Sequence, residues 1–328
     1  MRWLVVAGIV VLIVGGFVLI KPPTPAIIVA PEYIFSIGPL EVTNTMFTSW
    51  FVVALMIVAA VLASRSMSLV PGGLSGAVEA FIGGFYQMTE GIVGEANARR
   101  FFPVVATIFL YVLVSNYVGL LPMNFAVGAT HPGTGEVQAV FEQTSIVGID
   151  MAYIPIQADT VDTTQEEALK AEHAGDSFSG LLAPLFRSVM TDVNAPLALA
   201  IMSFIFVEYW GLSTLGLGYL KKFFDFGNLM RLRPMGIIDV FVGLLELISE
   251  LSRMVSFTFR LFGNIFAGEV LLLMMSFMVP LVLINVFYGL ELFVGLIQAF
   301  VFAMLTLVFA QSAVTSHHGD EEHEAAHE

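Results

Sequence analysis

Six long apolar runs constrain most strongly what this chain can fold into. Runs of about 20 apolar residues are long enough to cross a bilayer as helices. Such runs lie at residues 3–20, 46–64, 102–121, 195–217, 237–277 and 280–314. The last two are too long for one upright crossing, so we expect them to be steeply tilted or broken. The pattern predicts an all-α polytopic membrane protein with six spans.

The composition excludes several other classes of protein. With 57% hydrophobic and 12% charged residues, the chain is more apolar than a globular domain, which is about 25% charged. Its net charge of −14 gives no basic surface for nucleic acid. It contains no cysteine, which excludes disulfides and thiolate chemistry. All six histidines lie outside the apolar runs, so we expect neither a membrane-embedded metal site nor a cofactor.

Basic residues predict the orientation in the membrane, because cytoplasmic loops carry an excess of Lys and Arg. One side holds Arg65, Arg99, Arg100, Lys221, Lys222, Arg231 and Arg233, and the other holds Lys21, Lys170 and Arg187. We therefore expect both termini in the cytoplasm and the long loop at 122–192 outside.

Four further segments divide the chain. Residues 1–30 are interpreted as an N-terminal membrane anchor and linker, or alternatively as a signal peptide. Residues 72–98 are either an amphipathic helix at the membrane interface or a plain connecting helix. The outer loop at 122–192 is rich in glycine and acidic residues, and we expect most of it to be solvated surface. The acidic, His-rich tail at 316–328 is expected to be a solvated cytoplasmic segment.

A stripe of polar and charged residues runs along the fifth apolar run. Residues three and four apart share one face of a helix. This spacing joins Glu246, Glu250, Arg253, Phe257, Arg260, Asn264 and Ala267. In the sixth run it joins Glu291, Gly295 and Gln298, and Glu269 is placed to meet them across the hairpin. Because charged groups at membrane depth face protein or water rather than lipid, both stripes are candidate ion paths.

Arg260 is the member of this stripe that a purely structural role explains least well. Its nearest carboxylates on the same helix, Glu250 and Glu269, are at least nine residues away, too far for an i,i+3 or i,i+4 pair. We expect its counter-charge to come from the sixth span or from another subunit. Arg253, by contrast, is a candidate for a structural ion pair with either Glu250 or Glu246.

Two segments carry a resemblance to a known family. The sequence RLFGNIFAGE from Arg260 to Glu269, followed by QAFVF from Gln298, resembles subunit a of the bacterial-type F-type ATP synthase. Residues 43–46, 115–122 and 191–194 add weaker matches, and the resemblance covers residues 35–315. It implies five core membrane helices, of which the last two form a tilted C-terminal hairpin, so that the N-terminal span is additional.

The resemblance also implies a role for each matching residue. Arg260 matches the essential stator arginine of the family. The polar residues beside it are Asn264 and Gln298, and the acidic positions on its two sides are Glu246 and Glu269. We assign Glu269, Glu291, Asn116, Asp192 and Asn194 to an outer access route, and Glu246 with Glu250 to a cytoplasmic route.

By the same resemblance, the chain is a non-catalytic, ion-translocating subunit in a bacterial inner (plasma) membrane. Its implied partners are the c-ring of rotor subunits, the peripheral-stalk subunit b, other synthase subunits and membrane lipids. Desolvation keeps a carboxylic acid in lipid neutral, and a nearby cation favours its charged form. A rotor carboxylate facing Arg260 would therefore lose its proton, and the fixed positive charge would block proton leak between the two half-channels.

An autonomous cation or proton transporter is the alternative function. In that case Arg260 would pair with Glu269 or Glu291 within one chain. The sequence contains no inverted repeat of the kind common in secondary transporters, which favours the subunit over the transporter.

Overall fold

The computed structural model describes residues 8, 11–12, 14–16, 27–65, 73–121, 127–131, 137–146, 149–153, 160–162, 177–216, 218–219, 223, 235–279 and 282–315. Apart from short helical pieces, the expected N-terminal span at 3–20 lies outside the described residues, as does the tail at 316–328.

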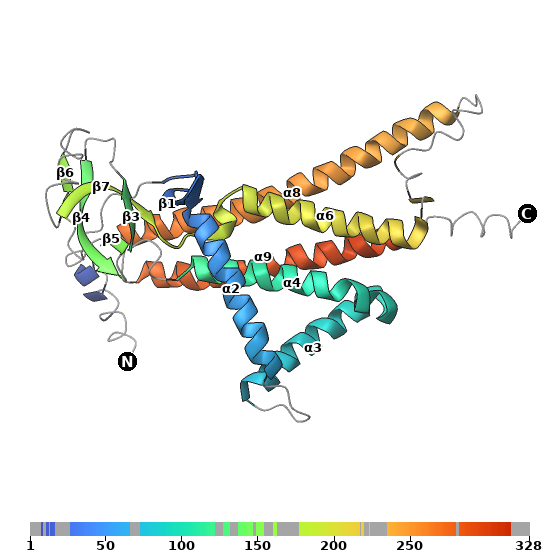
Figure 1. The fold of residues 1–328 in the computed structure, drawn as a ribbon, viewed down its shortest axis with the longest axis horizontal. Helices are drawn as coiled ribbons and strands as arrows, with labels where there is room; N and C mark the ends of the chain where they lie inside the picture. The colour runs from blue at the N-terminus through green and yellow to red at the C-terminus, as the bar shows by residue number, and fades with distance from the viewer. Residues whose placement is uncertain are drawn as a thin grey trace, which may run out of the picture. The chain divides into compact units, whose positions relative to one another are not determined.

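Five helices in the described part of the chain are long and apolar enough to cross a membrane. They are α2 (Asn44–Arg65), α4 (Glu95–Gly119), α6 (Asn194–Leu215), α8 (Met235–Met278) and α9 (Leu283–Val314) (Figure 1). They correspond to the five core helices expected from the sequence. The prediction of an all-α polytopic membrane protein is confirmed, and the chain is a multi-pass membrane protein.

The two C-terminal helices are unusually long. α8 has 44 residues and α9 has 32, and α8 runs through the whole fifth apolar run without a break. At 1.5 Å per residue, α8 is about 66 Å long, against a hydrocarbon layer of about 30 Å. The sequence left open whether this helix is tilted or broken. Because α8 is continuous, the structure favours a tilted helix.

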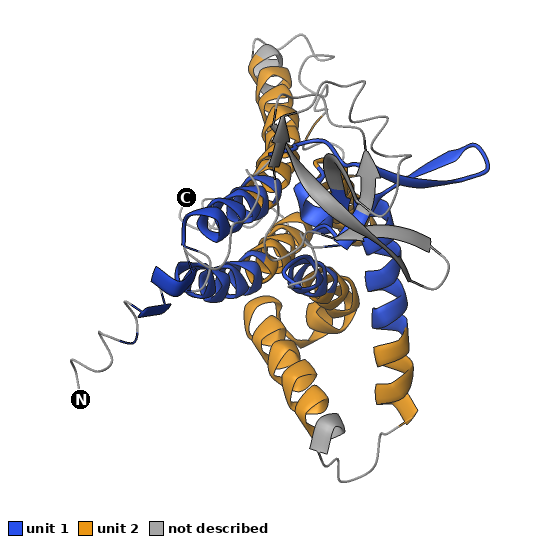
Figure 2. Cartoon of the chain, turned by 90° about the vertical axis from the view of Figure 1, so that its left-hand side faces the viewer, with its two compact units in different colours: residues 1–57, 111–192, 262–298 blue, residues 58–110, 193–261, 299–328 orange. Residues whose placement is uncertain are grey.

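The chain divides into two compact units, coloured separately in Figure 2. Unit 1 comprises residues 1–57, 111–192 and 262–298, and unit 2 comprises residues 58–110, 193–261 and 299–328. Unit 1 therefore holds the C-terminal parts of α4 and α8 together with the N-terminal parts of α2 and α9. Unit 2 holds the other parts of these helices, together with α3 (Gly73–Val93) and α6.

Aromatic side chains hold α3 against α4 within unit 2. The rings of Phe85 and Phe109 are 5.0 Å apart between centroids, and those of Tyr86 and Phe102 are 5.1 Å apart. The turn between the two helices is made by Gly94, whose φ is +77°, a backbone conformation that residues with a Cβ rarely adopt. Within the segment at 72–98, α3 is thus packed on α4, whose first residues close the segment. The expected position at the membrane interface stays a prediction.

A short hairpin precedes α2 in unit 1. Strands β1 (Tyr33–Ile37) and β2 (Leu40–Thr43) pair antiparallel. Asn44, the first residue of α2, is fully buried and accepts a hydrogen bond from the Glu32 main-chain N–H at 3.2 Å, while its own N–H donates to the Glu32 carbonyl at 2.9 Å. These bonds fix the chain at Glu32 to the beginning of α2.

The outer loop contains a sheet that the sequence analysis did not predict. Its antiparallel strands lie in the order β5-β3-β7-β4-β6. They are β3 (Val127–His131), β4 (Val137–Ile146), β5 (Ile149–Tyr153), β6 (Thr160–Asp162) and β7 (Ser177–Pro184). A short 3-10 helix, η1 (Val189–Thr191), then leads towards α6. Strands this short carry a weaker periodic signal than membrane spans do.

The positive φ of Gly94 predicts how the stability of the protein changes when this glycine is replaced. Gly94→Ala should destabilise the protein by about 1–2 kcal/mol, because a Cβ is disfavoured at this positive φ. Gly91→Ala is the matched control, since Gly91 lies inside α3 with open space around a built Cβ, and alanine there should stabilise the helix by up to about 1 kcal/mol. Thermal unfolding of the purified protein in detergent measures both, and shifts of the same sign would contradict the prediction.

Candidate functional site

Arg260 lies on the part of α8 that belongs to unit 2, with its side chain exposed. Within the described residues it takes part in no ion pair. Its recorded contact is with the ring of Phe257, one turn away, whose centroid lies 5.8 Å from the guanidinium carbon. The sequence predicted that no carboxylate of its own helix would neutralise it, and the described part of α8 provides none.

Exposed apolar side chains lie near Arg260 along α8, together with the exposed Ser256 one turn before it. Val255 is 53% exposed and Phe259 is 59% exposed. Extended apolar surface of this kind marks contact with lipid or with another protein. A permanently charged group in such a surface needs an opposite charge from outside the helix that carries it.

The two amides predicted beside the arginine meet within unit 1. The Asn264 Nδ2 donates a hydrogen bond to Gln298 Oε1 at 3.0 Å, which joins α8 to α9. Gln298 is buried, whereas Asn264 is exposed. The bond fixes the orientation of the Asn264 side chain, which lies one turn beyond Arg260 in the sequence of α8.

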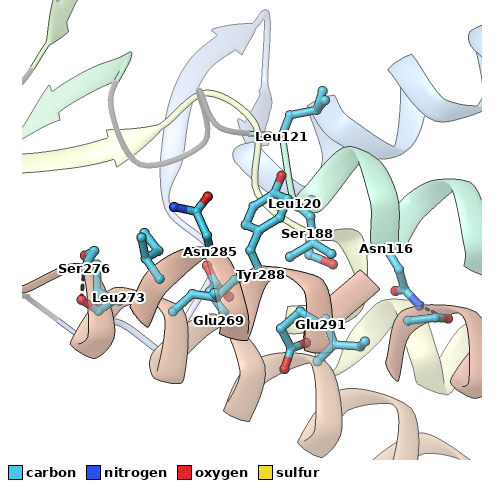
Figure 3. Close-up of a pocket in the computed structure, with 15 residues that line it drawn as sticks. Asn116, Leu120, Leu121, Ser188, Glu269, Leu273, Ser276, Asn285, Tyr288 and Glu291 are labelled. Carbon is cyan, nitrogen blue, oxygen red and sulfur yellow. Dashed lines mark hydrogen bonds between the residues drawn. The ribbon is translucent and has the colours of Figure 1, made fainter. Parts of the chain in front are cut away.

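A pocket of about 480 Å³ lies within unit 1, and we refer to it as the unit 1 pocket (Figure 3). Its polar lining consists of Asn116, Ser188, Glu269, Ser276, Asn285, Tyr288 and Glu291. α4 contributes Asn116, whose Nδ2 donates to the Gly295 carbonyl on α9 at 3.1 Å. The predicted outer-route residues Asn116, Glu269 and Glu291 are thus brought together around one space.

Three polar atoms of this lining are buried without a hydrogen-bond partner among the described residues. They are Asn116 Oδ1, Ser188 Oγ and Glu269 Oε2. A buried polar atom left unpaired in a dry site typically costs about 1–3 kcal/mol. A water molecule occupies about 30 Å³ in the liquid, so the pocket has room for several. The pocket is therefore large enough to hold water beside the side chains of Glu269 and Glu291.

Arg187 is bound to one of these carboxylates. It lies between β7 and η1, is only 4% exposed, and its Nε donates to Glu269 Oε1 at 3.2 Å. Its Nη1 and Nη2 donate to the main-chain carbonyls of Ala30 and Ile28, at 3.0 and 2.7 Å. Removing one member of a buried ion pair typically costs about 3–5 kcal/mol, so this contact holds unit 1 together as well as holding Glu269.

The other two predicted outer-route residues lie outside the lining of this pocket. Asp192 accepts a hydrogen bond from the Thr45 hydroxyl at 3.1 Å within unit 1. Asn194 is the first residue of α6 and belongs to unit 2. The contact between Asp192 and Thr45 ties the segment before α6 to the beginning of α2.

Unit 2 contains an ion pair between two residues of the same helix, α8. The Arg253 Nη1 donates to Glu250 Oε2 at 2.6 Å, and Glu250 is 2% exposed. The Arg253 guanidinium also lies over the Phe309 ring, 3.7 Å from its centroid, within the range of a cation–π contact. The pocket beside this pair is only about 20 Å³. Of the two pairings left open by the sequence, the structure contains Glu250 with Arg253.

Another carboxylate of unit 2, that of Glu208, was not singled out from the sequence. The Tyr219 hydroxyl donates to Glu208 on α6 at 3.1 Å. Burial raises the pKa of the Tyr219 hydroxyl, and the neighbouring Glu208 carboxylate raises it further. The hydroxyl therefore stays protonated and remains a donor.

Glu246, predicted for the cytoplasmic route, is half-buried on α8.

Some of the residues that the sequence analysis missed had a detectable signal. Asn285 and Tyr288 continue the stripe of Glu291, Gly295 and Gln298 towards the beginning of α9 at helical spacing. Arg187 and Ser188 had none, because they lie in a loop whose contacts with Glu269 and Ala30 join distant parts of the sequence. Among the described residues, no group of three His, Asp or Glu could hold a metal ion.

Comparison with known proteins finds one family along most of the chain. The family model described as ATP synthase A chain matches residues 46–311. The chain is 27% identical to ATP synthase subunit a of Moorella thermoacetica, covering 88% of this chain and 99% of the relative. It is 29% identical to ATP synthase subunit a 3 of Pelobacter propionicus, covering 82% and 87%. For ATP synthase subunit a of Helicobacter acinonychis the identity is 28%, covering 87% and 98%.

Close packing at Gly119 provides a test of the pocket geometry. A Cβ built on Gly119, which lines the unit 1 pocket, would overlap the Ser188 main chain, whose Cα lies 2.7 Å away, so Gly119→Ala should destabilise the protein by about 1–3 kcal/mol, as overpacking does. Gly263→Ala on α8, where a built Cβ meets nothing within 4 Å, should not. Thermal unfolding in detergent compares the two, and a Gly119→Ala protein as stable as Gly263→Ala would contradict the packing.

Proposed function

The chain belongs to the ATP synthase A chain family, and from that premise we propose that it is the stator subunit that carries protons to and from a rotor ring. Family membership gives it a membrane-sector role in an F-type ATP synthase, together with other subunits of that enzyme. The proposal adds two half-channels, one from each side of the membrane, with Arg260 between them. The observation that carries it is the exposed Arg260 guanidinium, which has no ion-pair partner within the described residues.

Arg260 would act through its fixed charge. Placing a charged side chain at the centre of a bilayer costs at least about 2.5–3.5 kcal/mol, and this penalty is relieved by an anion from a neighbouring subunit. The c-ring of rotor subunits would supply that anion as a carboxylate. In lipid the rotor carboxyl stays protonated, and beside the guanidinium the charged form is favoured. Each carboxyl that reaches Arg260 therefore releases its proton.

The unit 1 pocket would form the outer half-channel. Glu269 and Glu291 are carboxylates that can accept and pass on protons, and Asn116 supplies a polar wall between them. Support comes from a space large enough for water that Asn116, Glu269 and Glu291 line together. Asp192 and Asn194 would contribute outside the pocket, Asp192 through its contact with Thr45 at the beginning of α2.

Glu246 with Glu250 would serve the cytoplasmic half-channel. The 2.6 Å contact between Glu250 and Arg253 would hold the Glu250 carboxylate in a fixed position on this route. Arg253 is then a structural partner. Asn264 and Gln298 would hold the polar surface next to Arg260 in place through their mutual hydrogen bond.

The remaining expectations complete the proposal. We place the chain in a bacterial inner membrane with both termini in the cytoplasm. Residues 35–315 would form the subunit a domain, with the outer loop at 122–192 as an insertion. Residues 1–30 would be an added anchor and linker, and residues 316–328 a tail. The peripheral-stalk subunit b and membrane lipids would contact the faces that do not meet the rotor.

Replacing Arg260 tests this function directly. With Arg260→Gln in the assembled complex, ATP synthesis driven by an imposed proton gradient should fall to the background of empty vesicles, because no fixed charge remains to force deprotonation. Passive proton leak through the membrane sector should rise, because the electrostatic block is lost. Both are measured in the same reconstituted vesicles.

Arg99→Gln is the control for the loss of one arginine. Arg99 forms an exposed pair with Glu95 on α4, and such pairs contribute at most about 1 kcal/mol, so synthesis should be unchanged. Coupled synthesis retained in the Arg260→Gln complex would refute the proposed function.

A further inference from the structure

Arg187 itself has been given no role in the ion path proposed above, although its partner Glu269 has one. Its guanidinium is 4% exposed and donates to three acceptors, namely Glu269 Oε1, the Ala30 carbonyl and the Ile28 carbonyl. Its main-chain N–H donates to the Thr48 hydroxyl at 3.2 Å. All of these residues belong to unit 1. A planar guanidinium with several fixed donors holds its acceptors in a defined geometry.

Glu269 has its two carboxylate oxygens in different situations. Oε1 is bound by Arg187, whereas Oε2 is buried with no partner among the described residues. Glu269 also lines the unit 1 pocket. Because Arg187 holds one oxygen, the position of the Glu269 carboxylate in the lining of the pocket is fixed.

The position of Arg187 depends in turn on the segment at 28–30. Two of its three side-chain contacts are main-chain carbonyls of this segment, which precedes the residues matched by the family model. The chain is held again at Glu32 by its bonds with Asn44. The segment therefore has an anchored end and a fixed path past the guanidinium.

We propose that Arg187 is a positioning residue for proton transfer at Glu269, and that the segment at 28–30 orients it. The proposal rests on the proposed function, because it assumes that protons pass through the unit 1 pocket. The N-terminal segment then sets how fast the outer side delivers protons, although it is not part of the pocket lining.

The first experiment replaces Arg187 in the complete complex. With Arg187→Gln, the rate of proton uptake from the outer side per assembled complex should fall about 100-fold, the usual effect of misplacing a reacting group by about 1 Å. The solvent deuterium isotope effect should rise, because proton transfer at Glu269 becomes the slow step. Arg187→Lys keeps the charge but not the planar fork, so it should recover only part of the rate.

The second experiment moves the segment and leaves Arg187 in place. A single glycine inserted between Ala30 and Pro31 shifts the Ile28 and Ala30 carbonyls relative to the chain held at Glu32. It should lower proton uptake and raise the isotope effect as Arg187→Lys does. The matched control is a glycine inserted between Gly38 and Pro39, in the turn of the β1–β2 hairpin, which should change neither. The two insertion variants keep the proposal testable if the complex with Arg187→Gln fails to assemble.

The outcomes separate this inference from the function on which it rests. Native uptake and isotope effect in Arg187→Gln, with uptake abolished in Glu269→Gln, would overturn the inference and leave the proposed function standing. Equal behaviour of the two insertions would overturn the role of the segment at 28–30. Native uptake in Glu269→Gln would instead refute the outer half-channel.

Discussion

Placing a guanidinium in a membrane protein costs free energy unless an opposite charge or other acceptors lie beside it. Three arginines of this chain meet this cost in different ways. Arg187 is buried and bound to Glu269 and two main-chain carbonyls, and Arg253 is bound to Glu250 and lies over Phe309. Both carry their counter-charge within the chain, as buried charges must. Arg260 differs, because within the described residues its side chain is exposed and takes part in no ion pair. The same physical demand supports the structural and positioning roles proposed for two of these arginines, and it leaves the third available for the proposed pairing with a charge from outside the chain.

In the proposed mechanism, the continuous helix α8 carries the exposed Arg260 between carboxylates on either side of it. Glu246 comes fourteen residues before Arg260 and Glu269 comes nine residues after it, all on one unbroken helix. A carboxylate on each side of a fixed positive charge suits two access routes that must not join, since the charge repels a proton that attempts to pass directly. Transfer between the routes then requires a carrier that moves, and the membrane potential contributes about 2.3 kcal/mol per charge for every 100 mV.

The sequence allowed prediction of the features that depend on helical spacing and on charge at membrane depth. The isolated Arg260 belongs to this class. The membrane helices followed from the apolar runs, whereas the number of five core helices and the grouping of Asn116, Glu269 and Glu291 needed the family resemblance. Asn285 and Tyr288 extend the same stripe and were within reach of the same reasoning. Arg187 was not, because its partners at Ile28, Ala30 and Glu269 come from segments whose meeting depends on the tertiary fold. The outer sheet was missed for a related reason: its strands are short, and antiparallel pairing between non-adjacent segments leaves little local signal.

The two pockets suggest that the two sides of the proposed path handle protons differently. The unit 1 pocket, of about 480 Å³, is large enough to hold water beside Glu269 and Glu291. The unit 2 pocket, of about 20 Å³, lies beside a carboxylate that already has a guanidinium partner. In the proposed mechanism a wet outer route would let protons arrive quickly, so its rate would be set by the orientation of the carboxylate that receives them. Control of the outer side would then lie at Glu269 and, through its bound oxygen, at Arg187.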